Sequence, residues 1–171
     1  MRNKSYEQKK RPAKKCFLVG LFFVLSIQSE AAAEAANAIQ KAAAAKNVLI
    51  KVERTDGQKI IQGDGGRVRQ MFMTILDNAV KFSPEGGEVV MKIGDDEIAV
   101  IDGGCGISAE DLPHVFERFK KESSERNKGG SGLGLAIARE IAARHNMELR
   151  AQSPVTENLE WPGSMFTCVV K

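Results

Sequence analysis

The sequence has few of the residues that build metal centres and disulfide frameworks. Its 171 residues include three cysteines and two histidines. Cys16, Cys105 and Cys168 are odd in number, widely spaced and without a C-x-x-C pair, so the sequence indicates neither a disulfide framework nor a zinc site. The formal net charge is only +3, and no basic stripe is interleaved with aromatic residues, which argues against nucleic acid as a main partner.

The chain also lacks an apolar run of the length that a membrane-spanning helix needs, which is about 18 residues or more. Residues 16–27, CFLVGLFFVLSI, are apolar but shorter, and a basic stretch precedes them. A basic stretch, a short apolar run and an Ala-rich continuation are together similar to a secretory signal. We interpret residues 1–28 as a membrane-proximal anchor, a buried helix or an extension with no native role, and we favour some membrane association through residues 16–27.

An amide and a lysine stand near the end of a predicted helix. Apolar side chains recur at helical spacing over residues 65–82, and the motif DNAVKF at 77–82 closes this helix. The side-chain carbonyl of Asn78 is a hard oxygen ligand of the kind that Mg²⁺ prefers. Lys81, one turn further, would lie on nearly the same face and could meet a phosphate, while Phe82 could pack on a base. The alternative interpretation is a solvated or capping amide beside a surface cation.

A carboxylate follows a predicted buried strand. Residues 97–102 are apolar and β-branched, and the motif DGGCGI at 102–107 begins where this strand ends. Asp102 could accept a hydrogen bond from an amino group such as the exocyclic amine of adenine. The alternative interpretation is a plain glycine turn. Three glycines after the carboxylate allow positive φ angles and the close approach of a flat ligand: Gly103, Gly104 and Gly106.

A second glycine-rich motif, GGSGLGL at 129–135, opens a predicted helix over residues 132–146. Backbone N–H groups at a helix N-terminus, with glycines that allow close approach, form an anion site, so this motif predicts a phosphate cradle. It is not a Walker loop, because no Gly-Lys-Ser/Thr follows. It also fits the dinucleotide fingerprint poorly, because no strand leads directly into it.

The segment between the two glycine motifs contains FERF at 116–119. Phe116 and Phe119 are three residues apart and are expected to share one helical face, where they could anchor a short helix to the core. Residues 120–128 are charged and lack apolar periodicity, which predicts a mobile lid. The cations available to such a lid are Arg118, Lys120, Lys121, Arg126 and Lys128.

These four motifs, in this order, resemble the ATP-binding catalytic domain of sensor histidine kinases, in the wider GHKL superfamily that includes gyrase and Hsp90. The resemblance covers residues 47–171. It implies that Asn78 holds Mg²⁺, that Lys81 contacts phosphate, that Phe82 lies against adenine and that Asp102 bonds the adenine amine. It further implies ATP contacts from the two glycine-rich motifs, DGGCGI and GGSGLGL, and from FERF, which the family calls the F box. These contacts are Gly104, Gly106, Ile107, Phe116, Phe119, Gly130, Gly132, Leu133, Gly134 and Leu135.

The sequence departs from the family pattern at several positions. The family commonly has an asparagine where this chain has Thr74, which affects the placement of metal or water. It usually has two hydroxyl residues before the phenylalanine of the last strand, where this chain has Ser164-Met165-Phe166. Neither His114 nor His145 has the acidic neighbour and helical setting of a phosphoacceptor, so both are interpreted as structural.

The resemblance therefore implies transfer of the γ-phosphoryl group of ATP to a histidine on another domain or chain. The expected partners are a histidine-containing dimerisation domain or phosphotransfer protein and, indirectly, a response regulator. The expected location is cytoplasmic, at the inner face of the membrane if residues 16–27 act as an anchor. One alternative is an ATP- or ADP-binding pseudokinase or truncated interaction module without phosphotransfer. A serine kinase of the anti-sigma type is disfavoured by FERF and by the lack of a glutamate four residues before Asn78.

The periodicity predicts a two-layer α/β sandwich, a mixed sheet with helices on one face, of the Bergerat type that the resemblance implies. Residues 29–46 are Ala-rich, with almost no large apolar side chain to bury, and are predicted to form a helical linker before the ATP-binding domain at 47–171. Residues 47–54 and 58–62 are predicted to form a β-hairpin around Asp56-Gly57. Further strands are expected near 88–94, 97–102, 147–152 and 164–170.

Overall fold

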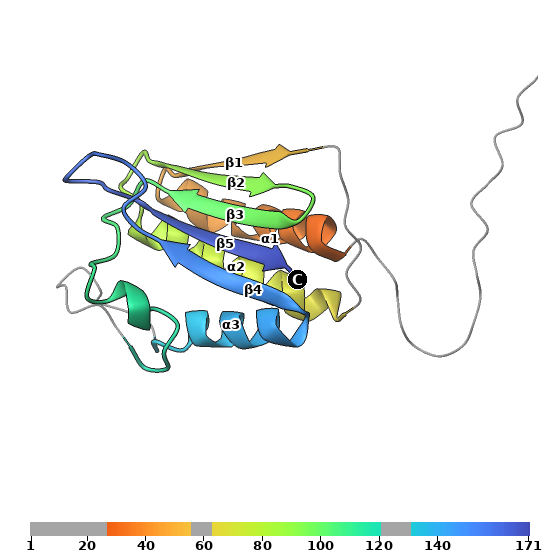
Figure 1. The fold of residues 1–171 in the computed structure, drawn as a ribbon. Coiled ribbons are helices and arrows are strands. Elements are labelled where there is room, and N and C mark those ends of the chain that lie inside the picture. The colour runs from red at the N-terminus through yellow and green to blue at the C-terminus, as the bar shows by residue number, and fades with distance from the viewer. Residues whose placement is uncertain (1–26, 56–62, 121–130) are drawn as a thin grey trace, which may run out of the picture.

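The structure is a computed structural model that describes residues 27–55, 63–120 and 131–171. These residues form a five-stranded mixed sheet with the α-helices packed against one face (Figure 1). The helices are α1 (Ile27–Ala45), α2 (Gly65–Phe82), the short 3-10 helix η1 (Leu112–His114) and α3 (Gly134–Arg144). The strands are β1 (Leu49–Arg54), β2 (Glu88–Ile93), β3 (Glu97–Asp102), β4 (Met147–Gln152) and β5 (Ser164–Val170). The predicted two-layer α/β sandwich is confirmed.

The strand order, β1-β2-β3-β5-β4, brings distant parts of the sequence together. The β1 strand runs parallel to β2, and α2 connects the two strands. The other neighbouring pairs are antiparallel, and the register of β3 with β5 places Asp102 opposite Ser164. Two polar residues from separate motifs therefore meet at one end of the sheet.

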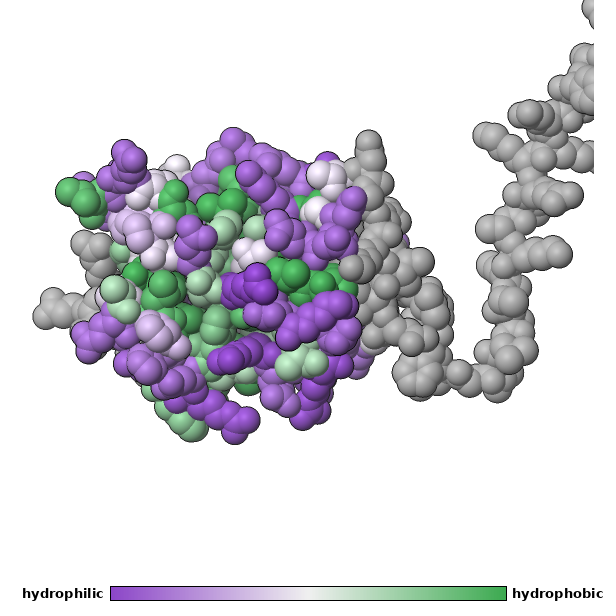
Figure 2. Space-filling model, viewed as in Figure 1, coloured by the Kyte–Doolittle hydropathy of each residue, from purple (hydrophilic) through white to green (hydrophobic). Residues whose placement is uncertain are grey.

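The core lies between the sheet and the helices because apolar residues alternate along the strands and recur at helical spacing in α2. Each large side chain buried there contributes about 1.5–3 kcal/mol of hydrophobic free energy. The largest fully buried side chains are Phe72, Met71, Ile75, Leu76, Met91, Ile98, Val68, Val89, Val100 and Cys168. The opposite face of the sheet carries mixed polar and apolar residues (Figure 2). Ion pairs such as Lys51–Glu88 and Lys92–Glu53 join β1 to β2.

The helix predicted over residues 29–46 forms as α1, but this helix also buries an Ala-rich face that the lack of large apolar side chains did not lead us to expect. The alanines of α1 recur at helical spacing and are buried against α2, which their small size allows to approach closely. An ion pair between Arg69 and Glu34 (3.6 Å) also joins the two helices. The Ala-rich face of α1 is thus buried because the two helices pack closely together, although its side chains are small. The buried residues of α1 are Ala31, Ala32, Ala35, Ala36, Ile39 and Ala43.

Two other expectations concern residues outside the described chain. The first half of the predicted hairpin forms β1, whereas residues 58–62 lie outside the described residues. Residues 1–26, which hold most of the apolar N-terminal run, also lie outside them. Among the described helices, none is both long enough and apolar enough to cross a membrane.

Candidate functional site

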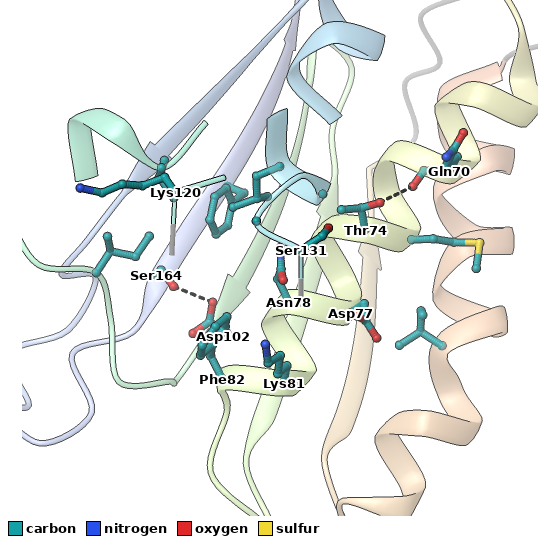
Figure 3. Close-up of a pocket in the computed structure, with 18 of the residues that line it drawn as sticks. Gln70, Thr74, Asp77, Asn78, Lys81, Phe82, Asp102, Lys120, Ser131 and Ser164 are labelled. Carbon is teal, nitrogen blue, oxygen red and sulfur yellow. Dashed lines mark hydrogen bonds between the residues drawn. The ribbon is translucent and has the colours of Figure 1, made fainter. Parts of the chain in front are cut away.

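A cavity of about 630 Å³ opens between α2, the start of α3 and the end of the sheet that carries Asp102 and Ser164 (Figure 3). This volume is typical of sites for small molecules and cofactors. The helix α2 contributes Asn78, Lys81 and Phe82 to one wall, so the regular spacing of one helix face aligns the predicted metal ligand with the predicted phosphate and base contacts.

The carboxylate of Asp102 is the most buried ionisable group of this cavity, with 3% of the residue exposed. Its Oδ1 accepts a hydrogen bond from the backbone N–H of Gly104 (2.9 Å), and its Oδ2 accepts one from the hydroxyl of Ser164 (2.8 Å). Burial raises the pKa of Asp102 above its ordinary value, and these hydrogen bonds offset part of that rise. Carboxylate oxygens accept more than one hydrogen bond each, so the group can still receive an amino group of a ligand.

The first glycine loop fits tightly around this carboxylate. A Cβ on Gly104 would stand 2.7 Å from both Asp102 Oδ1 and the carbonyl oxygen of Phe82, which only glycine avoids. Gly106 has a φ of 71°, in the left-handed region. The next residue, Ile107, donates its N–H to the hydroxyl of Ser153 (2.8 Å), so the loop is fixed to the segment between β4 and β5.

The amide of Asn78 meets the conditions for a metal ligand. It lines the cavity, and its side chain makes no hydrogen bond within the part of the chain that the structure describes. No cluster of three or more His, Cys, Asp or Glu side chains suited to a metal occurs among the described residues. A single amide oxygen fits Mg²⁺, because that ion usually keeps several waters and takes further oxygens from phosphates.

The second glycine loop leads into α3. The helix begins at Gly134, two residues later than predicted, and Leu133 precedes it without a side-chain cap. No side chain of the described residues accepts the N–H groups of the first turn, Gly134 to Ala136, and N–H groups in this position bind anions. Gly132 adopts a φ of 69° and lies against the backbone of Phe119 and Lys120.

The prediction that Phe116 and Phe119 share a helical face is wrong. In this region the described helix, η1, ends at His114, and Phe119 has a φ of 63°. Phe116 packs edge-on against Phe166 at a centroid distance of 6.2 Å, whereas Phe119 is 72% exposed. The backbone N–H of Phe119 donates to the carbonyl of Gly132 (2.9 Å), so the F-box segment is joined to the second glycine loop through the main chain.

The sequence alone indicated no site role for two polar residues that line the cavity, Ser164 and Asp111. Ser164 supports Asp102, and Asp111 forms an ion pair (3.2 Å) with Lys120, one of the predicted lid cations. Hydrogen bonds from Ser108 and Lys120 lower the pKa of Asp111. The position of Ser164 beside Asp102 follows from the register of β3 with β5, which the sequence alone does not show.

The cavity unites most of the predicted site residues. Those that line it are Asn78, Lys81, Phe82, Asp102, Gly106, Ile107, Gly132, Gly134 and Leu135. Gly104 and Leu133 lie in the adjoining loops, Phe116 and Phe119 do not line the cavity, and Gly130 lies outside the described residues.

Comparisons with known proteins agree with this geometry. The family described as "Histidine kinase-, DNA gyrase B-, and HSP90-like ATPase" matches residues 63–171. The sensor histidine kinase YkoH of Bacillus subtilis is 36% identical over 112 residues, which are 63% of this chain and 24% of YkoH. The sensor-like histidine kinase SenX3 of Mycolicibacterium smegmatis is 36% identical over 141 residues, which are 78% of this chain and 35% of SenX3. The chain therefore spans about a third or less of the length of these relatives.

A solved structure of the mycobacterial sensor histidine kinase MprB superposes with a TM-score of 0.70 and 26% identity, covering 83% of this chain and 92% of that one. The catalytic domain of the histidine kinase ThkA has a TM-score of 0.71 at 18% identity, which shows the shared fold; that match covers 88% of this chain and 95% of ThkA's. Fold and site thus define an ATP-binding α/β sandwich domain. This chain belongs to the histidine kinase-, DNA gyrase B- and HSP90-like ATPase family, and within it to the ATP-binding catalytic domains of sensor histidine kinases.

Proposed function

We propose that this domain binds Mg-ATP and transfers the γ-phosphoryl group to a histidine on another domain or chain. The observation that carries the proposal is the convergence of Asp102, Asn78, Lys81 and the first turn of α3 on one cavity. Each group matches one part of a nucleotide: an acceptor for the adenine amine, an oxygen for the metal, a cation and free N–H groups for the phosphates.

In this proposal the protein acts mainly by positioning and by neutralising charge, as is usual for phosphoryl transfer. Asp102 orients the base, and Lys81 and the start of α3 hold the phosphates. Asn78 would hold Mg²⁺, which supplies compensation for the negative charge of the phosphates. Lys120 lines the cavity and pairs with Asp111 there, so among the described lid cations it is the one that we expect to turn toward phosphate.

The acceptor in this proposal is external, because neither of the two histidines is placed to receive a phosphoryl group at the cavity. His145 Nδ1 lies 2.8 Å from the carbonyl of Ile141, and Nε2 accepts the backbone N–H of Asp64 (3.0 Å), so both ring nitrogens are engaged. His114 is exposed and pairs with Glu117 (2.7 Å). Neither histidine lines the cavity. A histidine-containing dimerisation domain or phosphotransfer protein, with a response regulator downstream, is the partner that we propose.

The second candidate function is nucleotide binding without phosphotransfer. It is favoured by Thr74, whose hydroxyl donates to the carbonyl of Gln70 (3.0 Å) and is therefore used within its own helix. A hydroxyl that is bonded within its own helix is less available to a metal-bound or attacking water than a free amide would be.

We also propose that residues 16–27 associate with the membrane on its cytoplasmic side.

Two measurements test these proposals in sequence. Calorimetry of ATP and ADP, with and without Mg²⁺, should show binding in the wild type that Asp102→Ala abolishes. Labelled ATP with an added histidine-containing hairpin domain should then place acid-labile phosphate on that domain. Nucleotide binding without transfer to any hairpin tested would favour the second function, and no binding at all would refute both.

A further inference from the structure

Lys46 follows α1 and joins it to the far end of α2. Its ammonium group donates to three backbone carbonyls: those of Val80 (3.0 Å), Lys81 (2.6 Å) and Ser83 (2.5 Å). The last carbonyls of a helix lack intrahelical partners and carry the negative end of the helix dipole. An ammonium has three protons, so Lys46 uses its whole donor capacity on this one turn.

The same turn also touches the first glycine loop. The carbonyl oxygen of Phe82 lies so close to Gly104 that an added Cβ would stand 2.7 Å from it. The N–H of Gly104 in turn donates to Asp102 Oδ1 (2.9 Å). The last turn of α2 therefore contacts both Lys46 and the first glycine loop. Lys81 and Phe82 point from this turn into the cavity, which Lys46 itself does not line (Figure 3).

We infer that Lys46 is a positioning residue for the nucleotide site, a role that rests on the proposed function of that site. It fixes the turn that carries Lys81 and Phe82, and through the contact of Phe82 with Gly104 it keeps the glycine loop in place against Asp102. Helix ends open more readily than helix centres, so an end with a binding role gains from an external cap. Lys46 also connects α1 to the site, to which α1 itself contributes the apolar side chain of Ile39.

The test uses Lys46→Met, which keeps the apolar stem and removes all three donors, and Lys46→Arg, which keeps a cation. Lys41→Met is the matched control, because Lys41 is an exposed lysine of α1. Hydrogen exchange of the free protein reports on residues 80–83 and 103–106, and calorimetry reports the affinity for ADP. Thermal unfolding confirms that each variant is folded at the temperature of measurement.

In Lys46→Met we expect faster exchange in both segments and ADP binding weakened by about 10- to 100-fold, which corresponds to the loss of about one hydrogen bond to a charged group. Lys46→Arg should recover part of the affinity, and Lys41→Met should match the wild type. A folded Lys46→Met with wild-type exchange at residues 103–106 and wild-type ADP affinity would overturn the inference. If the wild type itself fails to bind ADP, the proposed function fails, and the exchange at 103–106 still decides whether Lys46 controls the loop.

Discussion

The hydroxyl of Ser164 donates a 2.8 Å hydrogen bond to Oδ2 of Asp102, across 62 residues of sequence and between two adjacent strands. Both residues are buried, so this bond acts where water cannot replace it. It supports the ionised form of a carboxyl group whose pKa burial raises. The ability of Asp102 to accept an adenine amine thus depends on a residue from the other end of the domain.

Replacing Asp102 by Asn should separate stability from binding. Because the pKa of Asp102 is raised on folding, its ionisation costs folding free energy as the pH rises through the folded-state pKa. Asp102→Asn should therefore be more stable than the wild type at pH 7, and this advantage should shrink as the pH falls through that pKa. Nucleotide affinity should fall by at least about tenfold, because the amide can present a donor to the adenine amine. Urea unfolding across pH and calorimetry measure both; a stability difference independent of pH would contradict the argument.

Replacing Ser164 by Ala should shift the pH dependence of nucleotide binding. The hydrogen bond from Ser164 is the largest effect that lowers the pKa of Asp102, so its loss should raise that pKa further. Binding that needs the ionised carboxylate should then weaken at a higher pH in Ser164→Ala than in the wild type. Affinity titrations over pH follow the shift, and Ser164→Thr, which keeps the hydroxyl, should behave like the wild type. If the affinity depends on pH in the same way in all three proteins, Ser164 has no role in nucleotide binding.

Neighbouring glycines of the first loop should respond differently to alanine. A Cβ on Gly104 would collide with the backbone of Phe82, whereas a Cβ on Gly103 meets no atom within 4 Å. We expect Gly104→Ala to cost about 1–3 kcal/mol of unfolding free energy and to weaken ADP binding, as overpacking does. Gly103→Ala should stay within about 0.5 kcal/mol of the wild type. Chemical denaturation of the two variants side by side would show the contrast, and equal effects would mean that the loop relaxes around the new methyl group.

The alanine face of α1 predicts a size-dependent effect. Ala35 is fully buried in the helix layer, whereas Ala42 on the same helix is exposed. Ala35→Leu should destabilise the domain by about 1–3 kcal/mol, because closely packed helices have no room for a larger side chain. Ala42→Leu should leave the unfolding free energy nearly unchanged. If Ala35→Leu is as stable as the wild type, α1 does not pack on α2 as the structure has it.

His145 should matter for stability and not for phosphate chemistry. Its ring connects the end of α3 to Asp64, which caps the start of α2, so His145→Ala should cost about 1–2 kcal/mol through lost hydrogen bonds. His114→Ala, at an exposed position, should change stability little. Neither variant should lose phosphate incorporation from labelled ATP relative to the wild type, since we propose an external acceptor. Acid-labile phosphate that disappears with either histidine would contradict that proposal.

Local patterns predicted much of the fold and the chemistry. Helical spacing identified α2 and placed Asn78, Lys81 and Phe82 on it, and the β-branched run before Asp102 identified β3. These features depend on neighbours within one element, which periodicity records. The order of predicted strands and helices also gave the two-layer sandwich that the structure confirms, and the resemblance to the kinase domains added its Bergerat type.

The remaining features depend on pairings between distant segments. The role of Ser164 follows from an antiparallel register that no local pattern contains. The burial of α1 was missed because alanine gives a weak hydrophobic signal, although close approach makes its face part of the core. Phe119 was misplaced because helical spacing over four residues cannot foresee a residue with positive φ.

The β3–β5 pairing also determines when the cavity becomes complete during synthesis. The β1–α2–β2–β3 unit, with Asn78, Lys81 and Asp102, is made before α3, β4 and β5. Long-range strand pairing is slow because a long loop must close first. A nascent chain that has reached Asp102 still lacks both the helix start that would hold phosphate and the hydroxyl of Ser164. Premature stops before β5 should therefore give fragments without nucleotide affinity, even when every asparagine, lysine and aspartate of the site has been translated.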